Sequence, residues 1–160
     1  MMVLTEARSG EARSATWDES DMSRRVWSIP ADRMKGSQEH RIPLSTTPMK
    51  LLKMAKGLSG ASGLVFPSSR GKPLSDPILS ELLRKLGVQA VPNGLRRSFS
   101  DWCADTDQPK EVAKAALTHA ARGVDGAYFR SDLFERRLDV MAAWADYIVR
   151  HIDPRFSITA

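Results

Sequence analysis

The region from Phe134 to Ile152 constrains the fold most, because it carries the clearest helical pattern in the chain. Its apolar residues recur at spacings of four and three positions, and they are Phe134, Leu138, Met141, Ala145, Ile148 and Ile152. This spacing places them on one face of a helix, so we predict an amphipathic helix over 134–152. Its apolar face can be covered by the core of the same chain or by a second copy.

Other helices are predicted over 1–15, 45–56, 76–87 and 94–104, with a further one that starts at Pro109. In the first, Arg8 and Glu11 share a semi-apolar face, which costs desolvation unless the pair has partners. The second has Thr47 as a candidate N-cap and Pro48 at its first helical position.

The helix over 76–87 has boundary signals at both ends. Asp76 is a candidate N-cap, Pro77 takes the first helical position, and Gly87 ends the helix. Four leucines repeat along one face, and they are Leu79, Leu82, Leu83 and Leu86. We interpret this stripe as part of the core. In the helix over 94–104, the same periodicity puts Arg96 at the edge of an apolar stripe and Arg97 toward solvent.

Strands are expected where apolar and polar residues alternate. Val26–Ile29 and His40–Leu44 both alternate and can pair with each other. The polar connection between them carries Lys35 at or near a hairpin tip. Leu64–Phe66 is a further short apolar strand, whereas Trp17–Asp21 is expected to form an acidic turn.

Composition sets broad limits on the class of protein. The chain has 160 residues, of which 42% are hydrophobic, so one domain with its own core is expected. Its single cysteine, Cys103, excludes an intramolecular disulfide and favours a reducing compartment. We find no membrane span and no signal peptide. The net charge of +5 favours a polyanionic partner, but only weakly.

Several kinds of catalytic site are excluded by pattern. His40, His119 and His151 are scattered, and no cysteine or carboxylate cluster has metal-ligand spacing. There is no phosphate-binding P-loop, no GxGxxG motif and no nucleophile elbow. Five candidates remain on separate elements, and they are Arg8, Lys35, Arg96, His119 and Tyr128. Taken singly, each has an ordinary interpretation, such as a solvated loop lysine or a core histidine.

Together, these residues resemble the tyrosine recombinase family, the phage-type integrases. The motifs that carry the resemblance are Ala7-Arg8-Ser9-Gly10-Glu11, Met34-Lys35, Gly94-Leu95-Arg96-Arg97-Ser98, Leu117-Thr118-His119 and Ala127-Tyr128. The segment Gly63-Leu64-Val65-Phe66-Pro67-Ser68 is similar to integrases of prophages and genomic islands. The resemblance runs from about Leu4 to about Tyr147, and the ordered set Arg, Lys, Arg, His, Tyr is specific.

The resemblance implies DNA strand breakage and rejoining. Tyr128 would attack a DNA phosphodiester, leaving a 3′-phosphotyrosine and a free 5′-hydroxyl. The covalent bond stores the phosphoryl linkage, so neither metal nor cofactor is expected. Arg8 and Arg96 would hold the non-bridging oxygens, Lys35 would protonate the leaving oxygen, and His119 would donate a hydrogen bond to the phosphate. Glu11 would support Arg8.

Two features depart from the family pattern. The family has a histidine three residues before its second arginine, whereas this chain has Asn93, whose amide can donate a hydrogen bond but cannot accept a proton near neutral pH. The family also has an N-terminal core-binding domain before its first arginine. We therefore expect residues 1–160 to be a single catalytic domain, a fragment without the core-binding domain and the first catalytic-domain helix.

The resemblance also implies the fold class and the partners. We expect an α+β domain, mainly α, with a small antiparallel sheet of about three strands packed on helices. The expected partners are double-stranded DNA, other protomers bound through the C-terminal helix, and accessory DNA-bending proteins, with no membrane. The expected location is the cytoplasm of a bacterium, at the nucleoid, and the chain would derive from a phage, prophage or other mobile element.

Two other functions are kept as alternatives. A catalytically degenerate recombinase remnant would act only as a DNA-binding or interaction module, which Asn93 motivates. A helix-turn-helix regulator built around Gly94 is the third, and it would not need a phenol facing a phosphate.

Overall fold

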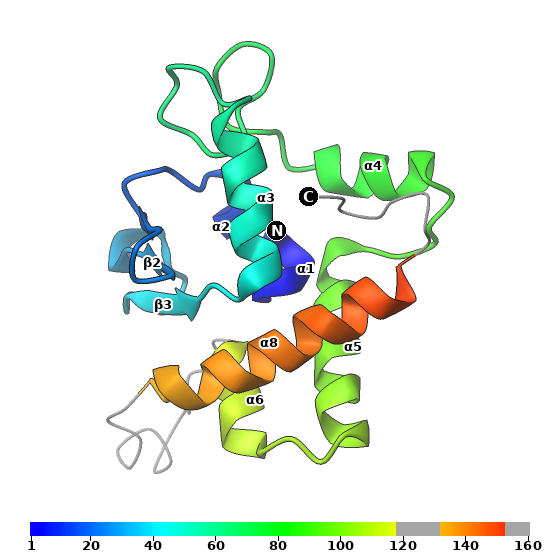
Figure 1. Ribbon diagram of the computed structural model, residues 1–160. Helices are drawn as coiled ribbons and strands as arrows, with labels where there is room; N and C mark the ends of the chain where they lie inside the picture. Colours follow the sequence, from blue (N-terminus) through cyan, green and yellow to red (C-terminus); the bar gives the residue numbers. More distant parts are fainter. Residues whose placement is uncertain (118–131, 153–160) are drawn as a thin grey trace.

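The structure is a computed structural model that describes residues 1–117 and 132–152. It has the expected α+β architecture, mainly helical with one small antiparallel sheet (Figure 1). The helices are α1 (Met2–Thr5), α2 (Ser9–Arg13), the 3-10 helix η1 (Ala31–Arg33), α3 (Thr46–Lys56), α4 (Ile78–Lys85), α5 (Pro92–Asp105), α6 (Lys110–Ala116) and α8 (Phe134–His151). The strands are β1 (Ser20–Asp21), β2 (Val26–Ile29) and β3 (His40–Pro43).

The sheet has the order β1-β2-β3, with both pairs antiparallel. The predicted pairing of β2 with β3 is confirmed, and Trp27 lies opposite Ile42. The predicted acidic turn is partly wrong, because Ser20 and Asp21 form β1 and extend the sheet. The predicted strand at Leu64–Phe66 is also wrong, because only Leu64 bridges to Thr16. Proline and a left-handed glycine bound this segment too closely for a longer ladder.

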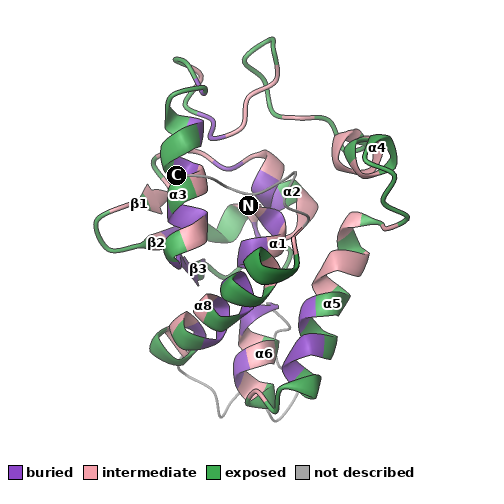
Figure 2. Ribbon diagram, turned by 45° about the vertical axis from the view of Figure 1, so that its right-hand side comes forward, coloured by how far each residue is buried: buried purple, intermediate pink, exposed green. Residues whose placement is uncertain are grey.

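Two clusters of buried side chains form the core. The first joins α1, α2, α3 and the sheet, and its fully buried members include Trp27, Ile29 and Leu52. The second joins α5, α6 and α8 around Phe99 and Trp144. Figure 2 shows the buried faces of α5, α6 and α8 turned toward one another. Helix α8 also contacts β3, α1 and α3, so it connects both clusters.

The predicted single helix over 1–15 is wrong, because the chain breaks at Glu6. Glu6 has a left-handed backbone with φ 55° and ends α1 after Thr5. Arg8 then has an extended backbone and caps α2. Arg8 and Glu11 are therefore a capping pair at a helix start, which accounts for charged residues on a semi-apolar face.

The predicted starts of two helices also need correction. Helix α3 is capped at Ser45, so Pro48 is its third residue and Thr47 is not its cap. Helix α4 begins at Ile78 with Pro77 in the cap position. The carboxylate of Asp76 instead accepts one hydrogen bond from the guanidinium of Arg13, which fixes the chain before α4 to α2.

The leucine stripe of α4 is not part of the buried core, contrary to the prediction, although Leu79 packs partly buried against the first cluster. None of the α4 residues is buried, and Leu82 and Leu86 are 50% and 48% exposed. Figure 1 shows α4 standing away from α3 and α8, joined to the domain by loops. Periodicity identifies an apolar face, but it does not show whether another part of the chain covers it.

The predicted helix over 134–152 is confirmed as α8, although its buried face is rotated from the predicted one. The buried residues are Arg137, Val140, Met141, Trp144 and Ala145, whereas Leu138 and Ile148 are only partly buried. Trp144 is part of an aromatic cluster with Phe99 and Trp102. The apolar face of α8 therefore packs on the core of its own chain.

Candidate functional site

The start of α2 holds Arg8 against a buried carboxylate. The backbone N–H of Arg8 donates to Oε2 of Glu11 at 2.6 Å, and its Nη1 donates to Oε1 at 2.8 Å. Glu11 is buried, whereas the Arg8 side chain is about one-third exposed at 31%. One carboxylate thus binds both the backbone N–H and the guanidinium of Arg8. The remaining N–H donors of this guanidinium are available to a ligand.

Arg96 comes from α5 and is half-buried. Its Nη2 donates to the backbone carbonyl of Leu117 at 2.5 Å, which ties α5 to the end of α6. Its Nε is buried and has no hydrogen-bond partner among the residues that the structure describes. The expectation that Arg96 is shielded and Arg97 exposed is confirmed, since the Arg97 side chain is 83% exposed.

The structure brings Arg8 and Arg96 into one electrostatic environment. Burial lowers the pKa of Arg96, and the positive charge of Arg8 lowers it further. The carboxylates of Glu6 and Glu11 oppose this by raising it. Two guanidiniums from distant parts of the chain thus lie near enough to repel each other, and buried carboxylates partly neutralise them. Such a cluster suits an anion with several oxygen acceptors.

Lys35 lies in the connection between β2 and β3, as expected, and is exposed. Two residues earlier, Arg33 anchors this connection by pairing with the carboxylate of Glu19 and donating to the carbonyl of Glu11 at 2.9 Å. Lys35 has no hydrogen bond or ion pair to the described part of the chain. The base of the Lys35 loop is therefore fixed to α2, and its tip is free to approach a ligand.

Asn93 lies in the first turn of α5 and is exposed. It precedes Arg96 by three positions, so the two residues lie on neighbouring positions of one helix face. His119 and Tyr128 lie outside the described residues.

The described chain resumes at Asp132, which is held on the sheet. The carboxylate of Asp132 accepts two hydrogen bonds from Arg41 of β3, at 2.8 and 2.9 Å. Arg137 of α8 lies 3.4 Å from the same carboxylate and donates to the carbonyl of Arg41 at 2.6 Å. This network fixes the start of α8 beside β3.

His40 was not among the predicted site residues, yet it lies among three arginines. Burial lowers its pKa to about 3, with further lowering by the charges of Arg137, Arg8 and Arg96. His40 is therefore neutral at physiological pH. The alternation in β3 could have revealed its burial, because His40 shares a face with Ile42.

Glu6 was also missed. The residue is 1% exposed, its carboxylate accepts a hydrogen bond from Trp144, and the charge of Arg96 lowers its pKa. A sequence signal existed, since a carboxylate two residues before Arg8 interrupts an apolar stretch.

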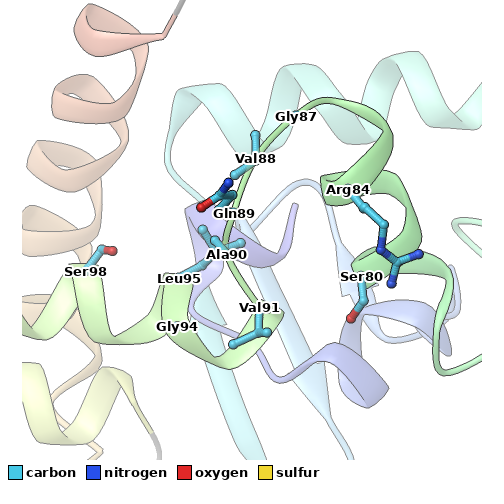
Figure 3. Close-up of a pocket in the computed structure, with 10 residues that line it drawn as sticks. All are labelled: Ser80, Arg84, Gly87, Val88, Gln89, Ala90, Val91, Gly94, Leu95 and Ser98. Carbon is cyan, nitrogen blue, oxygen red and sulfur yellow. The ribbon is translucent and has the colours of Figure 1, made fainter.

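A pocket lies between α4 and α5, with a volume of about 780 Å³ (Figure 3). Ser80 and Arg84 of α4 line one side, and Gly94 and Ser98 of α5 line the other. It borders the helix that carries Arg96 but contains neither arginine of the pair. We therefore locate the candidate site at Arg8 and Arg96 and not in this pocket.

Over residues 1–117 and 132–152, no group of His, Cys, Asp or Glu is arranged to hold a metal ion. None of the helices in these two ranges has the length and apolar character to cross a membrane.

Comparisons with known proteins agree with the motifs in the sequence. The prophage integrase IntA of Escherichia coli (strain K12) is 37% identical over 151 residues, which cover 91% of this chain and 37% of that protein. The integrase of Enterobacteria phage P4 is 33% identical over 170 residues, covering 92% of this chain and 38% of the relative. The integrase of Shigella phage Sf6 is 27% identical over 154 residues, covering 92% and 40%.

The chain thus spans about two-fifths of the length of these relatives. No solved structure matches it. Residues 1–133 match the phage integrase family, and the matched region includes both arginines of the pair. The chain belongs to the phage integrase family.

Proposed function

We propose that this chain is the catalytic domain of a site-specific DNA recombinase that cuts and rejoins DNA through a phosphotyrosine. The observation that carries the proposal is the shared environment of Arg8 and Arg96, each with a buried carboxylate nearby. A phosphodiester offers two non-bridging oxygens to two guanidiniums, and these donors stabilise the charge that develops on phosphorus in the transition state.

In the proposed step, the hydroxyl oxygen of Tyr128 attacks the phosphorus, and its proton passes to solvent water. The bond from phosphorus to the 5′-oxygen breaks, and Lys35 supplies the proton for that oxygen. His119 donates a hydrogen bond to the phosphate. Rejoining is the reverse reaction, in which a 5′-hydroxyl attacks the phosphotyrosine. Bond number is conserved, so no external energy source is required.

Asn93 favours a second candidate function. Its amide cannot take the phenol proton near neutral pH, so this chain would cleave slowly or only bind DNA. Loss of a general base costs about 10²- to 10⁴-fold in rate. The second candidate is therefore a degenerate recombinase that retains the phosphate-binding arginines without turnover.

The experiment that tests the proposal traps the covalent product. A nicked suicide duplex loses its short 5′-hydroxyl strand after cleavage, so a protein–DNA adduct should accumulate and be visible on a denaturing gel. Tyr128→Phe should abolish it. Tyr147→Phe is the matched control, since Tyr147 stacks on Trp144 and the ring remains. An adduct that persists in Tyr128→Phe would exclude the proposed nucleophile.

If no adduct forms, Asn93→His separates the two candidates. Restored cleavage in Asn93→His would support the degenerate recombinase, whereas cleavage by the unmodified chain would exclude it. In both cases binding to duplex DNA should weaken steeply with salt, because contacts to phosphates release counterions.

The proposal includes partners beyond DNA. Other protomers would bind through α8, and accessory DNA-bending proteins would assist. Since the apolar face of α8 is buried in its own chain, exchange between protomers would require α8 to leave that core. Light scattering at high protein concentration, with and without duplex DNA, would detect such association.

A further inference from the structure

Glu6 is a buried carboxylate that the proposed cleavage step does not use. It lies between α1 and α2, with 1% of its surface exposed. Its Oε1 accepts a hydrogen bond from Nε1 of Trp144 at 3.2 Å, and its Oε2 is buried without a partner among the described residues. A buried carboxylate oxygen without a hydrogen-bond partner lowers the stability of the folded chain. We therefore ask what role this carboxylate has.

Among the described residues, Arg96 has a buried hydrogen-bond donor without a partner, as Glu6 has a buried acceptor without one. Its Nε is a buried donor without a partner in the described part of the chain. The charges of Glu6 and Arg96 act on each other, since Arg96 lowers the pKa of Glu6 and Glu6 raises that of Arg96. No hydrogen bond or ion pair joins these two side chains in the part of the chain that the structure describes. A buried donor and a buried acceptor thus share one electrostatic environment without bonding to each other.

We propose that Glu6 is a positioning residue for Arg96, and that its ionised form competes with a bound phosphodiester for that guanidinium. The inference rests on the proposed function, because it assigns Arg96 to the DNA phosphate. A phosphate at Arg96 brings a second negative charge close to the carboxylate. Like charges disfavour each other, so phosphate binding and ionisation of Glu6 oppose each other.

The surrounding groups leave Glu6 as the titrating member of this cluster above neutral pH. Burial raises its pKa to about 8, against the lowering effects of Arg96 and Trp144. Cys103 on α5 faces Glu6, and burial raises its pKa to about 11. His40 on β3 has a pKa of about 3, and the amine of Met1 on α1 has a pKa of about 6 because of burial. The other charged groups near Arg96 are Arg8 and Glu11 of α2.

The test measures sulfate affinity of the full chain as a function of pH. Sulfate keeps its charge across the range, so any change belongs to the protein. Because only the chain with protonated Glu6 is competent in this scheme, apparent affinity should fall about tenfold between roughly pH 7 and roughly pH 9. Glu6→Gln should hold the neutral-pH affinity throughout. Glu111→Gln, which removes an exposed carboxylate paired with Arg136, should keep the fall.

A second readout follows Glu6 itself. The indole N–H resonance of Trp144 should shift with a midpoint near pH 8 in the wild type, since its donor contacts Oε1 of Glu6. This transition should vanish in Glu6→Gln, with the other three tryptophans as internal references. If Glu6→Gln does not fold, Glu6→Gly removes the carboxylate and suits the left-handed backbone at this position.

The outcomes separate this inference from the proposed function. A phosphotyrosine adduct together with pH-independent sulfate binding would overturn the role of Glu6 alone. An equal fall of affinity in Glu6→Gln would do the same. A fall that depends on Glu6, in a chain that forms no adduct, would support the coupling and count against cleavage.

Discussion

One carboxylate, that of Glu11, binds both the backbone N–H and the guanidinium of Arg8, at 2.6 and 2.8 Å. The helix start and the position of the arginine therefore depend on the same group. The interaction is buried on the Glu11 side and one-third exposed on the Arg8 side.

We predict that Glu11→Ala reduces adduct formation and also destabilises the fold. Loss of a capping partner costs about 0.5–2 kcal/mol, and the freed Arg8 loses its fixed orientation. Urea unfolding and suicide-substrate cleavage measure the two effects. Glu135→Ala, in the first turn of α8, is the control and should preserve cleavage. Unchanged cleavage in Glu11→Ala would show that Arg8 is held by other contacts.

We predict that His40 makes the fold sensitive to acid. Its folded-state pKa of about 3 lies below the ordinary value. The unfolded chain therefore binds the proton first, and stability present above about pH 6.5 is lost as the pH falls, by up to about 1.4 kcal/mol per unit. Urea unfolding at several pH values should show a shallower loss in His40→Gln. His151→Gln, an exposed histidine, should behave as the wild type does.

We predict that Arg137 stabilises the junction of α8 and β3. Arg137→Met should lower the free energy of unfolding by about 1–3 kcal/mol, because the carbonyl of Arg41 loses its donor. Arg136→Met is the adjacent control, and its exposed pair with Glu111 should contribute less than about 1 kcal/mol. A neutral or stabilised Arg137→Met would show that burying this guanidinium costs more than its bonds contribute.

We predict that the leucines of α4 contribute little to folding. Leu82→Ala should change the free energy of unfolding by about 1 kcal/mol or less, because half of the side chain is already in water. Leu52→Ala in α3, where the side chain is fully buried, should cost about 2–5 kcal/mol. Thermal or urea melts give both values. Equal losses of stability in the two variants would show that the Leu82 side chain contributes to the core as much as Leu52 does.

The sequence predicted those elements whose signal is local and periodic. The helix over 134–152 and the pairing of β2 with β3 follow from periods of 3.6 and 2 residues. The break at Glu6 could not be predicted this way, because the left-handed glutamate is buried and bonded to Trp144 of α8, which lies far away in the sequence. The exposure of the α4 leucines was missed for a related reason, since periodicity contains no information about the covering surface.

The candidate site likewise depends on contacts that local periodicity does not reveal. The shared environment of Arg8 and Arg96 arises from the tertiary structure, which brings α2 and α5 together, and no spacing in the sequence encodes it. Only resemblance to a family linked the two residues beforehand. Glu6 and His40 were missed because each looks unremarkable without knowledge of what surrounds it.

The indole of Trp144 donates to the carbonyl of Val3 at 2.7 Å as well as to Glu6, which joins the first helix to the last. The family match ends at residue 133, before α8 begins. A piece cut at that boundary would therefore uncover Phe99 and leave the Glu6 carboxyl without its donor. The residue at which the family match ends is thus not a boundary at which the chain can be divided, and any shorter version made for expression should retain α8.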